Sequence, residues 1–389
     1  MTDPSGTLFA VLAALIGSLI GSFGNVVVWR LPRGESVAFP PSHCPRCDHR
    51  LGPLELVPVL SWLALRGRCR HCGAPISPRY PLVEALMAAV FLAVALVWPP
   101  LTSGLAFLPL WIVLAMLIMA ALIDLDHYIL PDALTLPAVA LGVLGAFVTR
   151  ETLTSAAPDL PTPAAALVGA LAGAGVLALI NRVGALVLRR FADTKERLFP
   201  VSLDQVNVAA VVGALAGPWW GVAAGAAGVL VNLLARRTVR LPEPLAYGLW
   251  AVALVLSTTT FTVPTVTAVG GSVLAAGAWA LIGAAYWWIH DLVKPDPTAE
   301  QAEDDQEPVA MGFGDVKLAA ALGALLGWEK LLVCVLFAVV LGALFGVIGR
   351  LAGGKRVIPF GPYLLAGGLA ALFFGDATIR WYLGMLGVG

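Results

Sequence analysis

Apolar blocks of membrane-spanning length constrain this chain more than any other feature of its sequence. Runs of roughly 20 apolar residues recur along it, which is the length a helix needs to cross the hydrocarbon core of a bilayer. Hydrophobic residues make up 59% of the sequence and charged residues only 12%, about half the share found in soluble domains. The predicted fold class is therefore an all-α polytopic membrane protein, with about 10–12 membrane helices.

The positions of the apolar blocks predict where these helices lie. Spans are expected near 7–29, 81–98, 104–123, 133–148, 165–188, 219–235, 243–262, 271–290, 330–350 and 358–375. The blocks 206–217 and 315–326 measure roughly 18 Å as helices, too short for a core of about 30 Å. These two are expected to enter from one face and to turn within the protein. The first block lacks a basic flank at its N-terminal end, which favours a retained anchor over a signal peptide.

Basic residues concentrate in the loop between the first two spans. They are Arg30, Arg33, Arg46, Arg50, Arg66, Arg68, Arg70 and Arg79. The positive-inside rule places such a loop in the cytoplasm. The same topology puts the loops 124–132, 189–205, 236–241 and 291–314 on that side. A membrane topology accounts for these charges, so no nucleic-acid partner is predicted, and the acidic segment 293–310 is expected to be a cytoplasmic linker.

An internal repeat relates two parts of the chain at a constant offset of 110 positions. Segment 201–217 aligns with segment 311–327, and seven Val, Ala, Leu and Gly positions are identical. The neighbouring spans and Pro-containing turns follow in the same order, which favours duplication. Gln205 stands at the position of Asp315, and Asn207 stands at the position of Lys317. The first copy has therefore lost its ionisable pair.

Two CxxC pairs in the basic loop predict a zinc site. The ligands would be Cys44, Cys47, Cys69 and Cys72, with 21 residues between the pairs. Four thiolates complete a tetrahedral shell around Zn²⁺, and a closed shell indicates a structural metal. His43, His49 and His71 lie nearby, which leaves a swapped ligand open. Cys334 lies within an apolar span and is expected to be an inert packed residue.

Carboxylates at the ends of spans are the candidate catalytic groups, because charged residues near the bilayer core are costly. Asp124 ends the third span, and Asp315 opens a short apolar helix within the sequence GFGDVK. Gly312 and Gly314 leave room for a substrate backbone beside Asp315. Two carboxyls that share one proton are the arrangement of aspartyl proteases. Asp126 and Asp132 are expected to act as helix N-caps, and His127 as an interfacial polar residue.

At these residues the chain resembles the type IV prepilin peptidases, which are membrane-bound GxGD aspartyl proteases. The resemblance rests on GSFGNVVVWRLP at 21–32, the two CxxC pairs, RYPLVE at 79–84, ID at 123–124 with LPD at 130–132, GFGDVK at 312–317 and IPFGPY at 358–363. It covers roughly residues 7–148 and 270–389. The segment between the two aspartates is longer than is usual in the family.

The resemblance implies an activity and a set of partners. Asp124 and Asp315 would form the catalytic dyad, supported by Gly312, Gly314 and Lys317. The substrates would be type IV prepilins and type II secretion pseudopilins, cleaved after a glycine. Many family members then methylate the new N-terminus with S-adenosylmethionine, to which Glu84 or Asn25 could contribute, although packing explains both equally well. The location implied is the bacterial inner membrane, with the protein surrounded by lipid and the active site facing the cytoplasm.

The domain organisation follows from these assignments. The predicted parts are a first membrane helix (1–30), a zinc-binding loop (31–80), a membrane core with the first aspartate (81–148), an inserted degenerate repeat (160–268) and a core with the GxGD motif (270–389). Two alternative functions are kept. A transporter could use Asp124 and Asp315 as a proton relay, and an inactive scaffold could use the zinc loop for docking.

Overall fold

Helices make up nearly all of the regular structure. A computed structural model describes residues 4–100, 104–152, 160–187, 199–239, 242–259, 265–294, 312–351 and 359–387. The elements are α1 (Pro4–Arg30), the 3-10 turn η1 (Leu31–Arg33), α2 (Leu60–Ala64), α3 (Arg79–Val97), α5 (Phe107–His127), α6 (Asp132–Thr152), α7 (Pro163–Val187), α8 (Asp204–Ala216), α9 (Pro218–Ala235), α10 (Glu243–Thr259), α11 (Thr265–Val293), α12 (Phe313–Leu351) and α13 (Gly361–Met385). Within the described residues only isolated β-bridges occur, which confirms the all-α prediction.

The described part of the chain contains 9 helices that are long and apolar enough to cross a membrane. The polytopic prediction is therefore confirmed. The expected short helix at 206–217 is α8, of 13 residues. The expected span 243–262 corresponds to α10, which has 17 residues and is shorter than predicted. The acidic segment predicted as a linker lies almost entirely outside the described residues.

The second short apolar block does not end in a loop. Blocks 315–326 and 330–350 are joined in α12, which is interrupted only at Gly327, with φ 75° and ψ 171°. Gly217, 110 positions earlier, separates α8 from α9 with nearly the same angles, φ 93° and ψ 169°. A positive φ is strained for residues with a Cβ atom, so glycine suits both breaks. Both copies of the repeated sequence thus change direction at the same aligned glycine.

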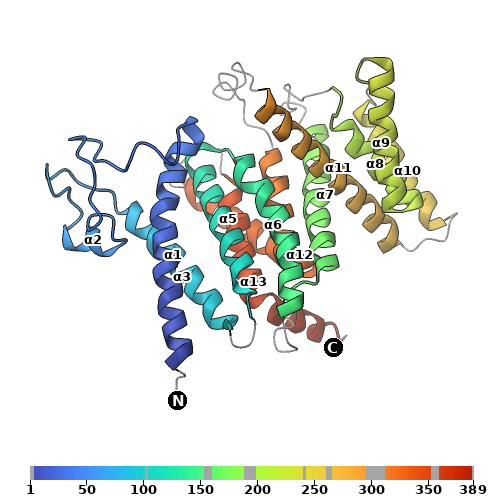
Figure 1. The fold of residues 1–389 in the computed structure, drawn as a ribbon. Coiled ribbons are helices and arrows are strands. Elements are labelled where there is room, and N and C mark those ends of the chain that lie inside the picture. Colours follow the sequence, from blue (N-terminus) through green and yellow to red (C-terminus); the bar gives the residue numbers. More distant parts are fainter. Residues whose placement is uncertain are drawn as a thin grey trace.

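The helices stand side by side, with their axes roughly aligned (Figure 1). At one edge α1 packs against α3, and the loop that carries α2 projects beyond them. At the other edge α8, α9 and α10 form a group that contacts the rest largely through α11. Between these edges α12 packs against α7, α13 and α6. The centre of the bundle is therefore built around α12.

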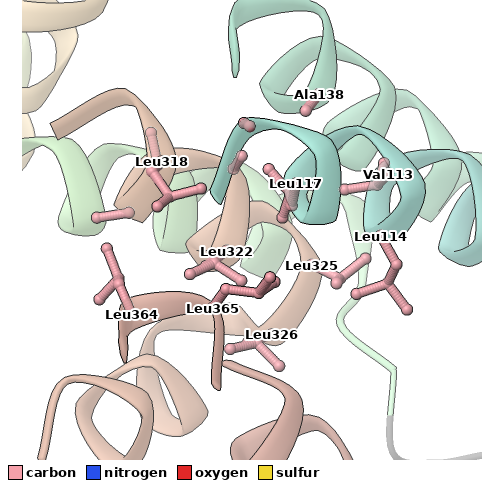
Figure 2. Close-up of a cluster of buried hydrophobic side chains, with 14 of the residues drawn as sticks. Val113, Leu114, Leu117, Ala138, Leu318, Leu322, Leu325, Leu326, Leu364 and Leu365 are labelled. Atoms are coloured by element: carbon pink, nitrogen blue, oxygen red, sulfur yellow. The ribbon is translucent and has the colours of Figure 1, made fainter. Parts of the chain in front are cut away.

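A cluster of aliphatic side chains fixes the first half of α12 against α5 and α13 (Figure 2). Leu318, Leu322 and Leu325 recur at a spacing of one or two helical turns, and so they share one face of α12. Figure 2 shows them beside Leu117 on α5 and Leu364 on α13, both of which are fully buried. The helix that begins near Asp315 is thereby held in a defined position relative to the end of α5.

Glycines bring α7 unusually close to α12. A Cβ atom added to Gly169 would lie 2.1 Å from the carbonyl oxygen of Gly323, and one added to Gly173 would lie 2.3 Å from that of Ala319. Gly169 and Gly173 are four positions apart, the spacing of the small-residue contacts that let membrane helices approach each other. Because lipid tails are as apolar as leucine, this close backbone packing is a main source of helix association here.

Candidate active site and metal centre

Asp124 lies in the last turn of α5, and its carboxylate is held by the start of α13. The side chain is buried, and the backbone N–H of Gly361 donates to Oδ2 over 2.9 Å. A Cβ atom at Gly361 would lie only 2.6 Å from the same oxygen, so the site requires a residue without a side chain there. Tyr128, with φ 59°, ends the helix and donates its N–H to the Asp124 carbonyl. The motif IPFGPY therefore contributes a hydrogen-bond donor to the site, a role that the sequence did not reveal.

Asp315 lies in the first turn of α12, which begins against the connection that follows α5. Its side chain is buried, and its backbone N–H bonds to the Gly312 carbonyl over 3.1 Å. The two carboxyls are close enough for the charge of Asp124 to act on that of Asp315. The structure therefore brings together two carboxylates that are 191 positions apart in the sequence. Two carboxyls within hydrogen-bond reach of each other can share one proton and activate a water molecule.

The two glycines of the GxGD motif have different surroundings. A Cβ atom on Gly314 would lie 2.7 Å from Cβ of Leu130, in the connection between α5 and α6. Gly314 therefore allows α12 to begin directly against that connection. A Cβ atom on Gly312 would lie 3.8 Å from an Asp315 carboxylate oxygen, an ordinary contact distance. Of the two glycines, Gly314 is therefore the one whose missing side chain the helix packing requires.

Cations near the two carboxylates are paired with other acids. Lys317, one turn after Gly314, forms an ion pair with Asp132, the first residue of α6. Arg79 at the start of α3 makes two hydrogen bonds to Asp126, of 2.8 and 2.5 Å. The sequence pattern favoured local capping roles for both acids, but each side chain instead holds a cation from another helix. Exposed His127, in the last turn of α5, agrees with an interfacial polar role.

A second buried ion pair lies on the other half of α12. Lys330 follows the break at Gly327 and pairs with Asp376 of α13 over 2.5 Å. Asp376 is 15 positions after Gly361, roughly 22 Å along the helix. The Lys330–Asp376 pair is therefore remote from Asp124 and Asp315. It provides a control for the Lys317–Asp132 pair, which lies close to Asp315 in the sequence.

Two amides of the repeated segment bond to backbone groups at helix ends, whereas the buried Asn207, aligned with Lys317, has no hydrogen-bond partner among the described residues. Gln205, aligned with Asp315, accepts the backbone N–H of Ser202 over 2.8 Å. The Gln205 side chain thus reaches back over the turn that leads into α8, whose N-cap residue is Leu203. Asn232 at the end of α9 donates to the Pro200 carbonyl over 3.0 Å and accepts the N–H of Val239 over 2.9 Å. These amides satisfy backbone groups instead of forming an acidic pair.

Glu84 joins the cysteine-containing loop to α3, and Asn25 joins α1 to the start of α3. Glu84 is buried on α3 and accepts the backbone N–H of Val59 over 2.7 Å. The Asn25 amide on α1 donates to the Tyr80 carbonyl over 3.2 Å. Both side chains thus have structural partners, which accords with the packing explanation of their presence.

The four cysteines of the loop form a cluster that could hold a metal ion. Their sulfur atoms all lie within 4.8 Å of one another. Cys44 and Cys72 are 3.9 Å apart at Sγ, close to the edge of about 3.8 Å expected for a tetrahedral shell with Zn–S bonds of ~2.3 Å.

The two CxxC turns have the same backbone design. The N–H of the first cysteine bonds to the carbonyl five positions later, from Cys44 to His49 and from Cys69 to Ala74. The residue four positions after each first cysteine donates back to that cysteine and has a positive φ, 56° at Asp48 and 69° at Gly73. Two matching turns present their sulfurs to one centre, which fits zinc. Cys334 lies away from them, buried in α12, and donates to the Leu364 carbonyl.

Comparison with known proteins defines the family. The profile described as the bacterial peptidase A24 N-terminal domain matches residues 15–98. The profile of the type IV leader peptidase family matches twice, over residues 111–236 and 229–347. No solved structure matches the chain.

Several curated relatives share extensive sequence with the chain. A prepilin leader peptidase/N-methyltransferase of Aeromonas hydrophila is 31% identical over 404 residues, which cover 97% of this chain and 94% of that protein. A type 4 prepilin-like proteins leader peptide-processing enzyme of Escherichia coli O78:H11 is 39% identical over 226 residues, covering 54% of this chain and 77% of the relative. A Myxococcus xanthus prepilin leader peptidase/N-methyltransferase is 46% identical over 144 residues, 36% of this chain and 42% of that protein.

The fold defines a polytopic membrane protein that carries two buried carboxyls at the ends of neighbouring helices. The matches along nearly its whole length then identify it more closely: the chain belongs to the type IV leader peptidase family. The resemblance seen in the sequence motifs is thereby confirmed. The transporter alternative is not favoured by these matches.

Proposed function

We propose that this protein removes the leader peptide from type IV prepilins, with Asp124 and Asp315 as its catalytic dyad. The observation that carries the proposal is that two buried carboxyls lie at neighbouring helix ends, in the last turn of α5 and the first turn of α12. The proposal is supported by relatives named for this activity over nearly the full length of the chain. Pseudopilins of type II secretion present the same kind of leader and are included as substrates.

The proposed reaction uses the two carboxyls in complementary protonation states. The ionised carboxylate takes a proton from a water molecule, and the protonated carboxyl donates to the oxygen of the scissile carbonyl. The Gly361 N–H stabilises and orients Asp124, to which it donates. Gly312, which has no side chain, would let the substrate backbone approach Asp315.

The neighbouring ion pairs support this chemistry because they keep two cations bound to acids outside the dyad. An unpaired Lys317 or Arg79 could bind the dyad and hold both carboxyls ionised, which would remove the proton that the mechanism needs. Asp132 and Asp126 engage these cations instead. Lys317 is thus proposed as a supporting residue that joins α12 to the start of α6.

We place the protein in the bacterial inner membrane with the dyad facing the cytoplasm. The basic loop after α1 and the dyad occur at the same end of the bundle, since α1 and α5 run from the opposite end toward it (Figure 1). The positive-inside rule assigns this end to the cytoplasm. A substrate whose hydrophobic helix lies in the lipid bilayer would then carry its basic leader at the level of the dyad.

The cysteine cluster and the second activity complete the proposal. Four sulfur ligands would close the shell of a Zn²⁺ ion, whose role would be to hold the two CxxC turns together. The names of the relatives include N-methyltransferase. We therefore propose that the protein also methylates the new N-terminus, with S-adenosylmethionine as the methyl donor.

The proposed domain organisation keeps the predicted parts, 1–30, 31–80, 81–148, 160–268 and 270–389. The two matches of one family profile support an internal duplication. In the second match, Val231-Asn232-Leu233 and Leu241-Pro242-Glu243 resemble the sequences around Asp124 and at 130–132. Asn232 would then be the degenerate counterpart of Asp124, as Gln205 is of Asp315. The added segment is proposed to be structural.

The test is cleavage of a purified prepilin by the full-length protein in lipid. Asp124→Asn and Asp315→Asn should each reduce cleavage on the order of 10³-fold or more, because removal of one member disables the dyad. Asp204→Asn, a buried acid at the start of α8, is the matched control and should retain activity. Cleavage that survives Asp315→Asn would refute the site assignment. Mass spectrometry of the product with added S-adenosylmethionine tests the methylation.

A further inference from the structure

A second group of metal-binding side chains lies beside the cysteine cluster. His49, Glu55 and His71 each offer a ligand atom, and these atoms all lie within 4.8 Å of one another. His49 follows Cys47 by two positions, and His71 directly precedes Cys72. Each CxxC turn therefore contributes one histidine, and the segment that joins the turns contributes the carboxylate.

The Glu55 carboxylate is held in place but lacks a full set of partners. Its Oε2 accepts the Gly52 N–H over 2.7 Å, and its side chain is only 10% exposed. Its Oε1 lies 3.8 Å from Nε2 of His71, too far for a hydrogen bond. Zinc–ligand bonds of about 2.0–2.2 Å in a tetrahedron need an O–N separation near 3.4 Å. A shift of a few tenths of an ångström would thus let one ion bind both atoms.

The two imidazoles are positioned for a common ligand. The rings of His49 and His71 lie 3.4 Å apart between centroids, with an interplanar angle of 33°. Both residues are exposed, so an ion can reach them from the solvent.

We propose that His49, Glu55 and His71 bind a second Zn²⁺ ion, separate from the ion of the four cysteines. Two imidazole nitrogens and one carboxylate oxygen are typical zinc donors, and three protein ligands leave a fourth position for water. Bound metal would tie the turn at Gly52–Glu55 to both CxxC turns. The loop would then carry a closed sulfur site and an open, exchangeable site side by side.

The test counts zinc equivalents on the full-length protein in detergent. Chelator-stripped protein is titrated with Zn²⁺ in competition with a chromophoric chelator. Wild type should bind about two ions per chain, and His49→Ala and Glu55→Gln should each bind about one. His43→Ala is the matched control, because His43 also neighbours a cysteine ligand and pairs with an acid, Asp48, but lies outside the group. It should bind two.

A parallel Co²⁺ titration reports on the cysteine site. Thiolate-to-cobalt charge-transfer absorption arises only from sulfur ligands, so it should saturate at the first equivalent and be unchanged in Glu55→Gln. Loss of the second equivalent with that absorption intact supports the proposal. A single equivalent in wild type, or a second equivalent that survives both His49→Ala and Glu55→Gln, overturns it.

Discussion

Replacing Gly361 by alanine should misplace the Asp124 carboxylate while leaving the helix intact. The new Cβ would lie 2.6 Å from Oδ2 of Asp124, whereas carbon and oxygen atoms normally approach to about 3.3 Å. The carboxylate must therefore move by about 0.7 Å, unless α13 yields instead. The backbone N–H that donates to Asp124 is retained, so the substitution tests position and not the loss of a donor.

The size of the effect follows from the displacement. A shift of about 1 Å in a catalytic group can cost roughly 10²-fold in rate, so cleavage should fall roughly tenfold to a hundredfold. That range corresponds to about 1.4–2.7 kcal/mol in activation free energy. Overpacking typically costs about 1–3 kcal/mol in stability, so the thermal unfolding temperature should fall moderately while the protein stays folded.

The assay measures kcat/KM for prepilin cleavage, from rates at substrate concentrations well below KM. Thermal unfolding is measured on the same samples. Gly384→Ala is the matched control, since it lies in the same helix and a Cβ there meets nothing within 4 Å. It should leave cleavage and stability nearly unchanged. Cleavage by Gly361→Ala within about twofold of wild type would refute the reasoning that Asp124 must hold its position against α13.

Two further predictions concern the cations and the cysteines. Lys317→Met and Lys330→Met each leave a partly exposed aspartate unpaired, so each should lower the free energy of unfolding by roughly 1–2 kcal/mol in denaturation measurements. Only Lys317→Met should also lower prepilin cleavage, because its partner Asp132 is the first residue of α6, the helix that follows Asp124. Equal losses of cleavage in Lys317→Met and Lys330→Met would contradict this. Cys44→Ser should remove the tightly bound zinc in elemental analysis, whereas Cys334→Ser, buried in α12, should leave it in place. Retention of that zinc by Cys44→Ser would refute the four-cysteine site.

Local sequence patterns predicted the helices well, because a lipid environment demands long apolar helices whatever their packing partners. Each expected span corresponds to a helix, although α10 is shorter than expected. The break within α12 was predicted as a turn between two elements, and Gly327 instead redirects one nearly continuous helix. The cysteine cluster was also predictable, since a CxxC turn fixes two sulfurs within four residues.

The partners of the dyad could not be predicted from the chain. Nothing in the sequence near Asp124 points to Gly361, 237 positions away, as the donor to its carboxylate. The ion pair of Lys317 with Asp132 spans 185 positions, and local spacing favoured a capping role for that acid. The proximity of His49 to His71 likewise depends on how the two CxxC turns pack.

The sequence alone determined the membrane class, the order of the family motifs, the four-cysteine cluster and the choice of Asp124 and Asp315 as candidates. Only the tertiary structure decided which helix faces meet, and therefore that α5, α12 and α13 converge on the two carboxyls. The physical reason is that side chains facing lipid and side chains facing protein are equally apolar in a membrane. Hydropathy locates the helices, and close contacts between glycines, leucines and paired charges decide how they pack.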